Sequence, residues 1–156
     1  MYERPIAELL DPKKVLVEHA ATRVIDAAKL MAKKKVSAVL VVEDGRLVGI
    51  FTERDAVHRV IAKRRDPGLT TLAEVMTRNP RTVSPDETLG YALLLMHEHG
   101  FRHLPVVQGT APVGIISARK ALVPDLEEFV SVAQRRASIQ RYARGRGPAE
   151  RPRSAS

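Results

Sequence analysis

Gly49, Thr52 and Asp55 are the residues whose types and spacing most clearly suit chemistry, since they stand three positions apart. Gly49 would let another group approach the backbone closely. Thr52 stands where a helix is expected to begin, and the free N–H groups of such a position suit a phosphate. The carboxylate of Asp55 can accept hydrogen bonds from two vicinal hydroxyls and so hold a ribose. The spacing therefore indicates a nucleotide site.

The pair Thr52 and Asp55 also has a purely structural interpretation. The spacing matches a variant of the capping box, in which two side chains bond to backbone N–H groups at the start of a helix. Such a cap would stabilise the helix by about 1 kcal/mol with no ligand present. The two interpretations are compatible, because a cap can also line a site, and we favour the ligand site because the spacing lies within a repeated framework.

That framework emerges when the chain is aligned with itself at an offset of 65 residues, which requires no gap. Apolar positions match throughout, and Val48-Gly49-Ile50 falls on Val113-Gly114-Ile115. The second copy retains the glycine and has Ser117 in place of threonine, but Lys120 replaces Asp55. Lysine cannot accept hydrogen bonds from ribose hydroxyls. We therefore expect one strong site per chain, with the second empty or altered toward an anion.

Each copy has the pattern of a β-α-β-β-α unit. Apolar residues at i, i+3, i+4 and i+7 predict one face of a helix in each copy: Val24, Ala27, Ala28 and Met31, then Leu89, Ala92, Leu93 and Met96. Valine-rich runs predict buried strands over 38–42, 47–51, 104–107 and 113–116, preceded in each copy by a short extended piece at 15–17 or 81–83. Asp44-Gly45 predicts a tight turn, and Ser84-Pro85-Asp86-Glu87 predicts a helix start.

The predicted fold class is α/β (α+β), with two tandem repeats over residues 5–66 and 67–123 and Pro67-Gly68 as the linker. Each repeat alone would have a thin core, so we expect the two to pack together with pseudo-twofold symmetry. A helix is predicted over 124–142, followed by a disordered, arginine-rich tail over 143–156.

Composition narrows the class of protein further. The chain has no cysteine, which excludes disulfides and thiolate metal sites. It has no apolar run of transmembrane length and no signal-peptide pattern at its start, so we expect a soluble, cytoplasmic protein without a membrane partner. Seven arginines and one glutamate lie between Ala133 and Ser156, so this segment carries most of the net charge of +8. No metal site is predicted, because His97 and His99 do not share a helix face.

Three motifs carry a resemblance to a known family: Gly-Ile-Phe-Thr-Glu-Arg-Asp (49–55), Met-Thr-Arg-Asn-Pro (76–80) and Arg-His-Leu-Pro-Val-Val (102–107). With them the chain resembles a tandem cystathionine-β-synthase-type (CBS) domain pair, or Bateman module, over residues 5–123. It is most similar to the small stand-alone bacterial members, which have no catalytic domain.

The resemblance implies an adenosine-containing ligand (AMP, ADP, ATP, NAD(H) or S-adenosylmethionine) in a cleft between the repeats. It would give the ribose to Asp55, a phosphate or ribose contact to Thr52 and the adenine to Ile50 and Val17. Arg102 and His103 would reach phosphates across the cleft. The full candidate site is Val17, Ile50, Thr52, Arg54, Asp55, Arg102, His103, Ser117 and Lys120. Alternatively, Arg54 is part of a solvated first turn, and Arg102 and His103 are ordinary surface residues.

The leading hypothesis is a regulatory sensor, not an enzyme, that forms a homodimer and passes a ligand-driven change to an unidentified partner protein. The alternative is a ligand-free interaction scaffold that acts through its basic C-terminal tail on nucleic acid or an acidic protein. The tail could neutralise phosphates, although only Tyr142 is available there for stacking on bases.

Overall fold

The structure, a computed structural model, describes residues 2–121 and 131–139 of the chain. The chain divides into two compact units, residues 1–121 and 122–156. In the second unit the described residues, 131–139, are helical, in agreement with the predicted helix over 124–142. The rest of that range and the predicted tail, 143–156, lie outside the described residues. The first unit holds both copies of the repeat up to residue 121, and we call them repeat 1 (5–66) and repeat 2 (67–123).

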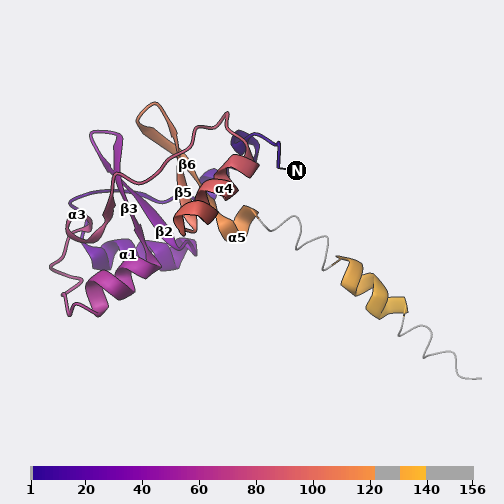
Figure 1. The fold of residues 1–156 in the computed structure, drawn as a ribbon. Helices are drawn as coiled ribbons and strands as arrows, with labels where there is room; N and C mark the ends of the chain where they lie inside the picture. Colours follow the sequence, from indigo (N-terminus) through magenta and orange to yellow (C-terminus); the bar gives the residue numbers. More distant parts are fainter. Residues whose placement is uncertain (1, 122–130, 140–156) are drawn as a thin grey trace, which may run out of the picture. The chain divides into compact units, whose positions relative to one another are not determined.

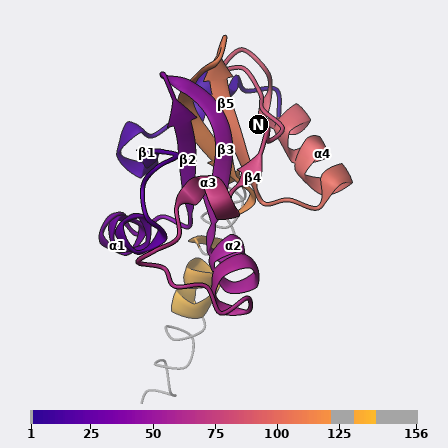
Figure 2. The same ribbon diagram turned by 90° about the vertical axis from the view of Figure 1, so that its left-hand side faces the viewer.

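Figure 1 shows the fold, in which β2 and β3 of repeat 1 lie side by side. Repeat 1 is built around a sheet with the strand order β1-β2-β3-β4, whose four strands are labelled in Figure 2. β1 runs parallel to β2, whereas β2–β3 and β3–β4 are antiparallel. Asp44 and Gly45 both have positive φ, 48° and 74°, so the β2–β3 hairpin turns through the tight turn that the sequence predicts. The elements are β1 (Val17–His19), α1 (Val24–Lys34), β2 (Ala38–Glu43), β3 (Arg46–Thr52), α2 (Glu53–Asp55) and the π-type helix η3 (Ala56–Ile61).

Repeat 2 has the same plan with a shorter sheet. Its elements are α4 (Leu89–His99), β5 (His103–Gln108), β6 (Ala111–Ser117) and α5 (Ala118–Ala121), and β5 and β6 form an antiparallel hairpin. The extended piece predicted at 81–83 is reduced to one parallel bridge between Val83 and Val106. In that bridge the Val83 N–H donates to the Pro105 carbonyl at 3.0 Å, and the Val107 N–H donates to the Val83 carbonyl at 2.9 Å.

The predicted start of the second-copy helix at Ser84 is wrong by four residues. α4 begins at Leu89, and Thr88 caps it by accepting a hydrogen bond from the Tyr91 N–H at 3.3 Å. Ser84 and Glu87 do meet, because the Ser84 N–H donates to the Glu87 carboxylate at 2.7 Å, but they close a turn ahead of the helix. Short polar side chains close turns and cap helices by the same kind of bond, so the pattern alone does not separate the two.

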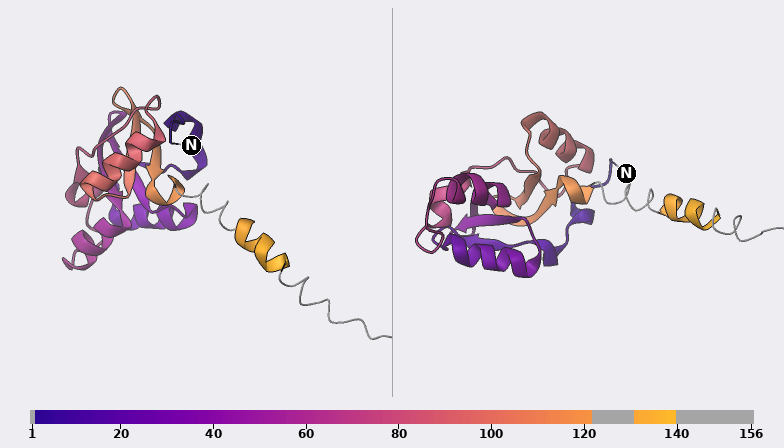
Figure 3. Two further views of the ribbon diagram at one scale, coloured as in Figure 1. Left: turned by 45° about the vertical axis from the view of Figure 1, so that its right-hand side comes forward. Right: turned by 90° about the horizontal axis from the view of Figure 1, so that it is seen from below.

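The opening segment of each repeat packs on the other repeat. The N-terminal arm, residues 2–10, lies beside α4 (Figure 3): the Ile6 N–H donates to the Glu87 carbonyl at 2.8 Å, and the Leu89 N–H donates to the Arg4 carbonyl at 3.0 Å. The linker arm, residues 67–78, does the same at the start of α1, where the Val24 N–H donates to the Thr70 carbonyl at 2.9 Å. The arms thus supply backbone acceptors for N–H groups that a helix start leaves unpaired.

The exchanged arms also carry secondary structure of their own. The N-terminal arm includes the 3₁₀ helix η1 (Ile6–Leu9) and is followed by a second one, η2 (Pro12–Lys14). The linker arm forms α3 (Leu72–Val75) and β4 (Thr77–Arg78), and β4 is the edge strand of the repeat 1 sheet. Repeat 1 therefore completes its sheet with residues that belong to repeat 2 in the sequence.

The matched glycines of the two copies accommodate these arms. A Cβ on Gly49 would overlap the Met76 thioether and lie 3.0 Å from the Thr77 carbonyl oxygen. A Cβ on Gly114 would lie 2.6 Å from Leu10 Cδ2 and 3.1 Å from Cδ1. In the structure, the group that approaches each glycine closely belongs to the chain itself, which agrees with the close approach predicted for Gly49.

We expect Gly114→Ala to lower the free energy of unfolding by roughly 1–3 kcal/mol, because the new methyl group must displace Leu10 from a filled site. Urea unfolding at equilibrium measures the change. Gly68→Ala is the control, since a Cβ there meets only the Asp66 carboxylate at 3.3 Å, and we expect a change within about 0.5 kcal/mol. Equal effects of the two substitutions would contradict the packing role of Gly114.

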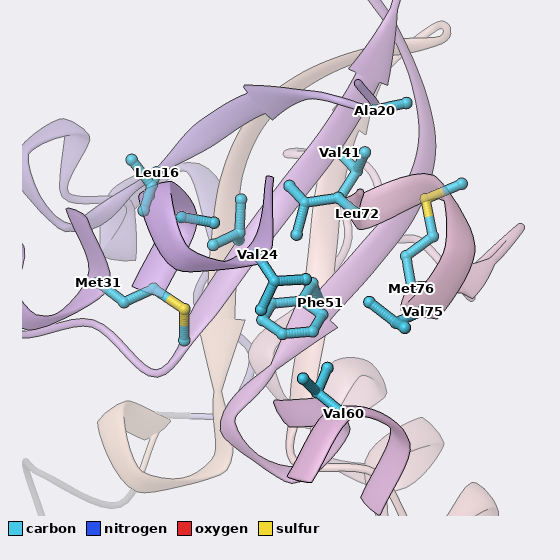
Figure 4. Packing of buried hydrophobic residues seen from close by; sticks show 12 residues of the cluster. Leu16, Ala20, Val24, Met31, Val41, Phe51, Val60, Leu72, Val75 and Met76 are labelled. Carbon is cyan, nitrogen blue, oxygen red and sulfur yellow. The ribbon is translucent and has the colours of Figure 1, made fainter. Parts of the chain in front are cut away.

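The two faces of the repeat 1 sheet bury different clusters. One face packs under α1 and the linker arm, where Phe51 contacts a core that includes Val24, Leu72 and Met76 (Figure 4). The opposite face joins the repeats through a small cluster of Ala38, Leu40 and Ile50, with Ile115 of repeat 2 packed against it. Ile50 and Ile115 are 65 residues apart, so equivalent residues meet where the repeats join, as the predicted pseudo-twofold symmetry requires.

Candidate functional site

Thr52 and Asp55 form the reciprocal cap that the sequence predicts as one of two alternatives. The Thr52 N–H donates to Asp55 Oδ2 at 2.9 Å, and the Thr52 hydroxyl donates to the same oxygen at 3.2 Å. The Asp55 N–H donates back to the Thr52 hydroxyl at 3.4 Å. These bonds fix the carboxylate at the end of β3, in the first turn of α2.

Asp55 is buried, with 8% of the residue exposed. Its second oxygen, Oδ1, lies 3.4 Å from Nε of Arg59 one helical turn on. Sequence reasoning missed Arg59, although an acid followed by arginine at i+4 is a recognisable helix-surface pair. A carboxylate has about four acceptor positions, and this geometry uses three, so Asp55 retains capacity for a ligand hydroxyl.

The predicted adenine-contacting residues share one row of the sheet. Val17 and Ile50 each pair with Leu40 on the central strand β2, so their side chains project from the same face. Ile50 is buried in the cluster that joins the repeats, with 7% exposed, whereas Val17 at the sheet edge is 40% exposed. The structure therefore places both residues on the sheet face that joins the repeats, and Val17 is the accessible one.

His103 links the candidate residues of repeat 2 to repeat 1. Its Nε2 lies 2.7 Å from the hydroxyl of Ser37, which directly precedes β2. In the sheets, Ala38 pairs with Thr52 and His103 pairs with Ser117, so the contact joins the two strand ends that carry the candidate polar residues. Ser37 was not among the predicted site residues, because a lone serine at a strand start carries no distinctive signal.

The remaining predicted residues lie in or directly beside α2, β5, β6 and α5. Arg54 is exposed in the first turn of α2, and Arg102 is exposed just before β5, where its carbonyl accepts from the Ala118 N–H at 2.8 Å. Ser117 is half-buried at the end of β6. Lys120 follows three residues later in α5, where the structure describes its backbone only. The structure thus brings Thr52, Asp55 and His103 to one region.

Burial is the main cause that lowers the pKa of His103 below its ordinary value of 6.5. The charge of Arg102 lowers this pKa further, whereas Glu53 raises it. The neutral imidazole is therefore favoured in the folded chain, and it can share a hydrogen bond with the Ser37 hydroxyl.

This direction predicts a pH dependence of stability. In the window between the lowered pKa of folded His103 and 6.5, the unfolded chain binds more protons, so the free energy of unfolding rises with pH. The contribution of neutral His103 to the free energy of unfolding is fully present above pH 6.5. It is lost as the pH falls through the pKa of His103 in the folded chain. Urea unfolding of wild type and His103→Gln at pH values on both sides of that window measures it. Glutamine does not titrate, so we expect a flatter profile; identical profiles would contradict the prediction.

Two further features bear on the kind of site. Within residues 2–121 and 131–139, no group of three or more histidine, aspartate or glutamate side chains is arranged to hold a metal ion. His99, part of the His-Glu-His run, instead has Nδ1 at 3.1 Å from the Leu95 carbonyl oxygen of its own helix. In the same described ranges, every helix is too short or too polar to span a membrane.

Two α/β repeats that exchange their opening arms and pack together through one sheet face define a tandem domain pair. The profile of the CBS domain family matches residues 6–62 and 72–123. The chain therefore belongs to the CBS domain family and carries two copies of the domain.

Known relatives agree with this assignment. The CBS domain-containing protein CBSCBSPB2 of Arabidopsis thaliana is 35% identical over 127 residues, which is 81% of this chain but 24% of the relative. This chain thus spans about a quarter of that relative's length. A solved structure of a putative signal-transduction protein with CBS domains from Burkholderia ambifaria has a TM-score of 0.71 and 35% identity, covering 76% of this chain and 91% of that one.

A second solved structure contains ligands. The CBS domain pair of protein MJ0100, in complex with 5′-methylthioadenosine and S-adenosyl-L-methionine, has a TM-score of 0.68 and 27% identity. The match covers 75% of this chain and 95% of that one.

Proposed function

We propose that this protein is a non-catalytic sensor, which binds an adenosine-containing ligand where its two CBS repeats meet and thereby changes how a partner protein binds. The class of ligand is AMP, ADP, ATP, NAD(H) or S-adenosylmethionine. The adenosyl ligands of the MJ0100 domain pair support this class. A ligand can drive such a change only if it binds one arrangement of the repeats better than another.

The observation that carries the proposal is the buried carboxylate of Asp55. It is held rigidly by Thr52 at the end of β3, and it still has acceptor capacity. The ribose hydroxyls would donate to Asp55, and the adenine would lie toward Val17 and Ile50. His103, already in contact with Ser37 of the other repeat, would lie on the phosphate or sulfonium side together with Arg102.

We further propose one ligand per chain and a homodimer. Lys120 stands where the second copy would need an acid, so the second position would be empty or would take an anion. The dimer is supported by large apolar side chains that are exposed on helices: Val57 and Ile61 on η3, and Tyr91 and Leu94 on α4. The molar mass in solution tests the dimer.

The test of the sensor is a thermal-shift panel of AMP, ADP, ATP, NAD, NADH and S-adenosylmethionine, with the matching guanosine nucleotides as controls. A ligand at a hundred times its Kd adds about 2.7 kcal/mol of stability. At about 3–4 °C per kcal/mol for a domain of this size, this is a shift of about 8–11 °C in the melting temperature. We expect an adenosine compound to give this shift, the guanosine controls to give none, and calorimetry to give one site per chain.

If no compound of the panel raises the melting temperature, the scaffold alternative becomes the better explanation. The helix at 131–139 favours that alternative, because it exposes Arg135 and Arg136. Salt-sensitive binding to nucleic acid, lost on removal of the residues after Tyr142, would then be the expected result.

A further inference from the structure

Arg59 joins the carboxylate of the candidate site to the linker arm. Its Nε lies 3.4 Å from Asp55 Oδ1, and its Nη1 donates to the carbonyls of Met76 at 2.8 Å and Val75 at 3.4 Å. Only arginine among the cationic side chains offers a planar fork that can serve such separate acceptors at once. One half-exposed side chain thus connects repeat 1's own site to a segment that repeat 2 contributes.

The linker arm, to which Arg59 donates, is packed into the core and carries regular secondary structure. Leu72, Val75 and Met76 are all buried in the repeat 1 core. Directly after them, β4 pairs with β3, with Thr77 opposite Ile50 and Arg78 opposite Gly49. The chain then continues into repeat 2, so a shift of the linker arm would be passed on to that repeat.

At the Asp55 end of this connection, the existing hydrogen bonds restrict how a ligand hydroxyl can bind to the carboxylate. Thr52 occupies Oδ2 with two hydrogen bonds, so a ligand hydroxyl must approach Oδ1 and share it with Arg59. Arg59 therefore lies beside the oxygen that the ligand must use, and the two carbonyls of the linker arm hold Arg59 there.

The second copy loses both members of this pair. At the offset of 65 residues, Lys120 replaces Asp55 and Pro124 replaces Arg59. Proline has no side-chain donor, so the pair cannot form there. The acid and its arginine are therefore present together in one copy and absent together from the other, as expected of two residues that serve one site.

We propose that Arg59 is a positioning residue, which holds Asp55 for its ligand and transmits occupancy of the site to the linker arm. This inference rests on the proposed function. Ligand binding would tighten the contact between Arg59 and the carbonyls of Val75 and Met76, and would so slow opening of residues 72–78.

Hydrogen exchange of residues 72–78, with and without S-adenosylmethionine or AMP, tests the proposal on wild type, Arg59→Gln and Arg78→Gln. Arg78 is the matched control, because its Nη2 donates to the Ala73 carbonyl of the same arm at 3.0 Å without a contact to Asp55. We expect the ligand to slow exchange of the arm in wild type and Arg78→Gln. In Arg59→Gln we expect affinity to fall about tenfold and the slowing to vanish at saturation.

A second experiment without ligand separates failure of this inference from failure of the proposed function. It compares the rates of hydrogen exchange in residues 72–78 among Asp55→Asn, Arg59→Gln and the double variant. Non-additive effects support the connection. Additive effects, or slowing that persists in Arg59→Gln with ligand, overturn it even when wild type binds the ligand. If no adenosine compound binds wild type, the proposed function fails, and the ligand-driven part of this inference fails with it.

Discussion

Replacing Ile6 by alanine is expected to destabilise repeat 2, although Ile6 belongs to the start of repeat 1 in the sequence. Ile6 is fully buried and belongs to the cluster of Leu89, Leu104 and Ile116, all from repeat 2. Truncation of a buried isoleucine removes its transfer free energy and leaves a cavity, which together cost about 2–5 kcal/mol. Equilibrium unfolding in urea gives the total, and hydrogen exchange shows which strands lose protection. We expect β5 and β6 to be affected first.

Leu72→Ala is the reciprocal variant, because Leu72 is fully buried in the repeat 1 core despite its place at the start of repeat 2. We expect a loss of the same size, with protection lost first in β2 and β3. Leu69→Ala is the control for both, since Leu69 is 81% exposed and should cost less than about 0.5 kcal/mol. If Ile6→Ala cost no more than Leu69→Ala, the exchanged packing of the arms would be wrong.

The strands and helices of this fold are largely predictable from the sequence. Hydrophobic periodicity places Val24, Ala27 and Met31 on the buried face of α1, and all three are buried. The Asp44-Gly45 turn follows from residue chemistry alone, since both positions need positive φ. These features are local: the residues that determine them lie within one or two helical turns of each other.

The exchange of the arms is not predictable in the same way. The two arms have similar sequences, Ile-Ala-Glu-Leu-Leu and Leu-Ala-Glu-Val-Met, and so do the two surfaces that receive them. The apolar pattern therefore predicts that each arm packs on a repeat, but it does not indicate whether this is the arm's own repeat or the other one. The way the two repeats pack in three dimensions decides which repeat receives each arm. This packing also explains why both copies have a glycine where an arm approaches.

The candidate site was predictable to the same extent. Thr52 and Asp55 lie close together in the sequence, so their mutual bonds follow from spacing. The contact of Ser37 with His103 joins residues 66 positions apart, and the bonds of Arg59 to the linker arm span 16 and 17 positions. Such contacts depend on how the repeats and arms assemble, which a single sequence does not specify.

Replacing Asp55 by asparagine is expected to abolish the stabilisation that an adenosine ligand gives. The amide keeps the shape of the side chain, but one of its two acceptor oxygens becomes a donor. It then cannot serve the Thr52 N–H, Arg59 and a ribose together. We expect the ligand-induced gain of about 2.7 kcal/mol at a hundred times the wild-type Kd to fall below detection. The ligand-free variant should itself lose about 1–3 kcal/mol. Calorimetric titration below the melting temperature measures affinity apart from that loss.

Asp26→Asn is the matched control for this substitution. Asp26 also lies in the first turn of a repeat 1 helix and also pairs with an arginine, Arg23, at 3.2 Å, but that pair is exposed. Exposed pairs contribute little, so we expect a change within about 1 kcal/mol and an unaltered response to the ligand. If Asp55→Asn kept the wild-type affinity while losing stability, Asp55 would be a helix cap and nothing more. The ligand would then have to bind through residues other than those at the end of β3.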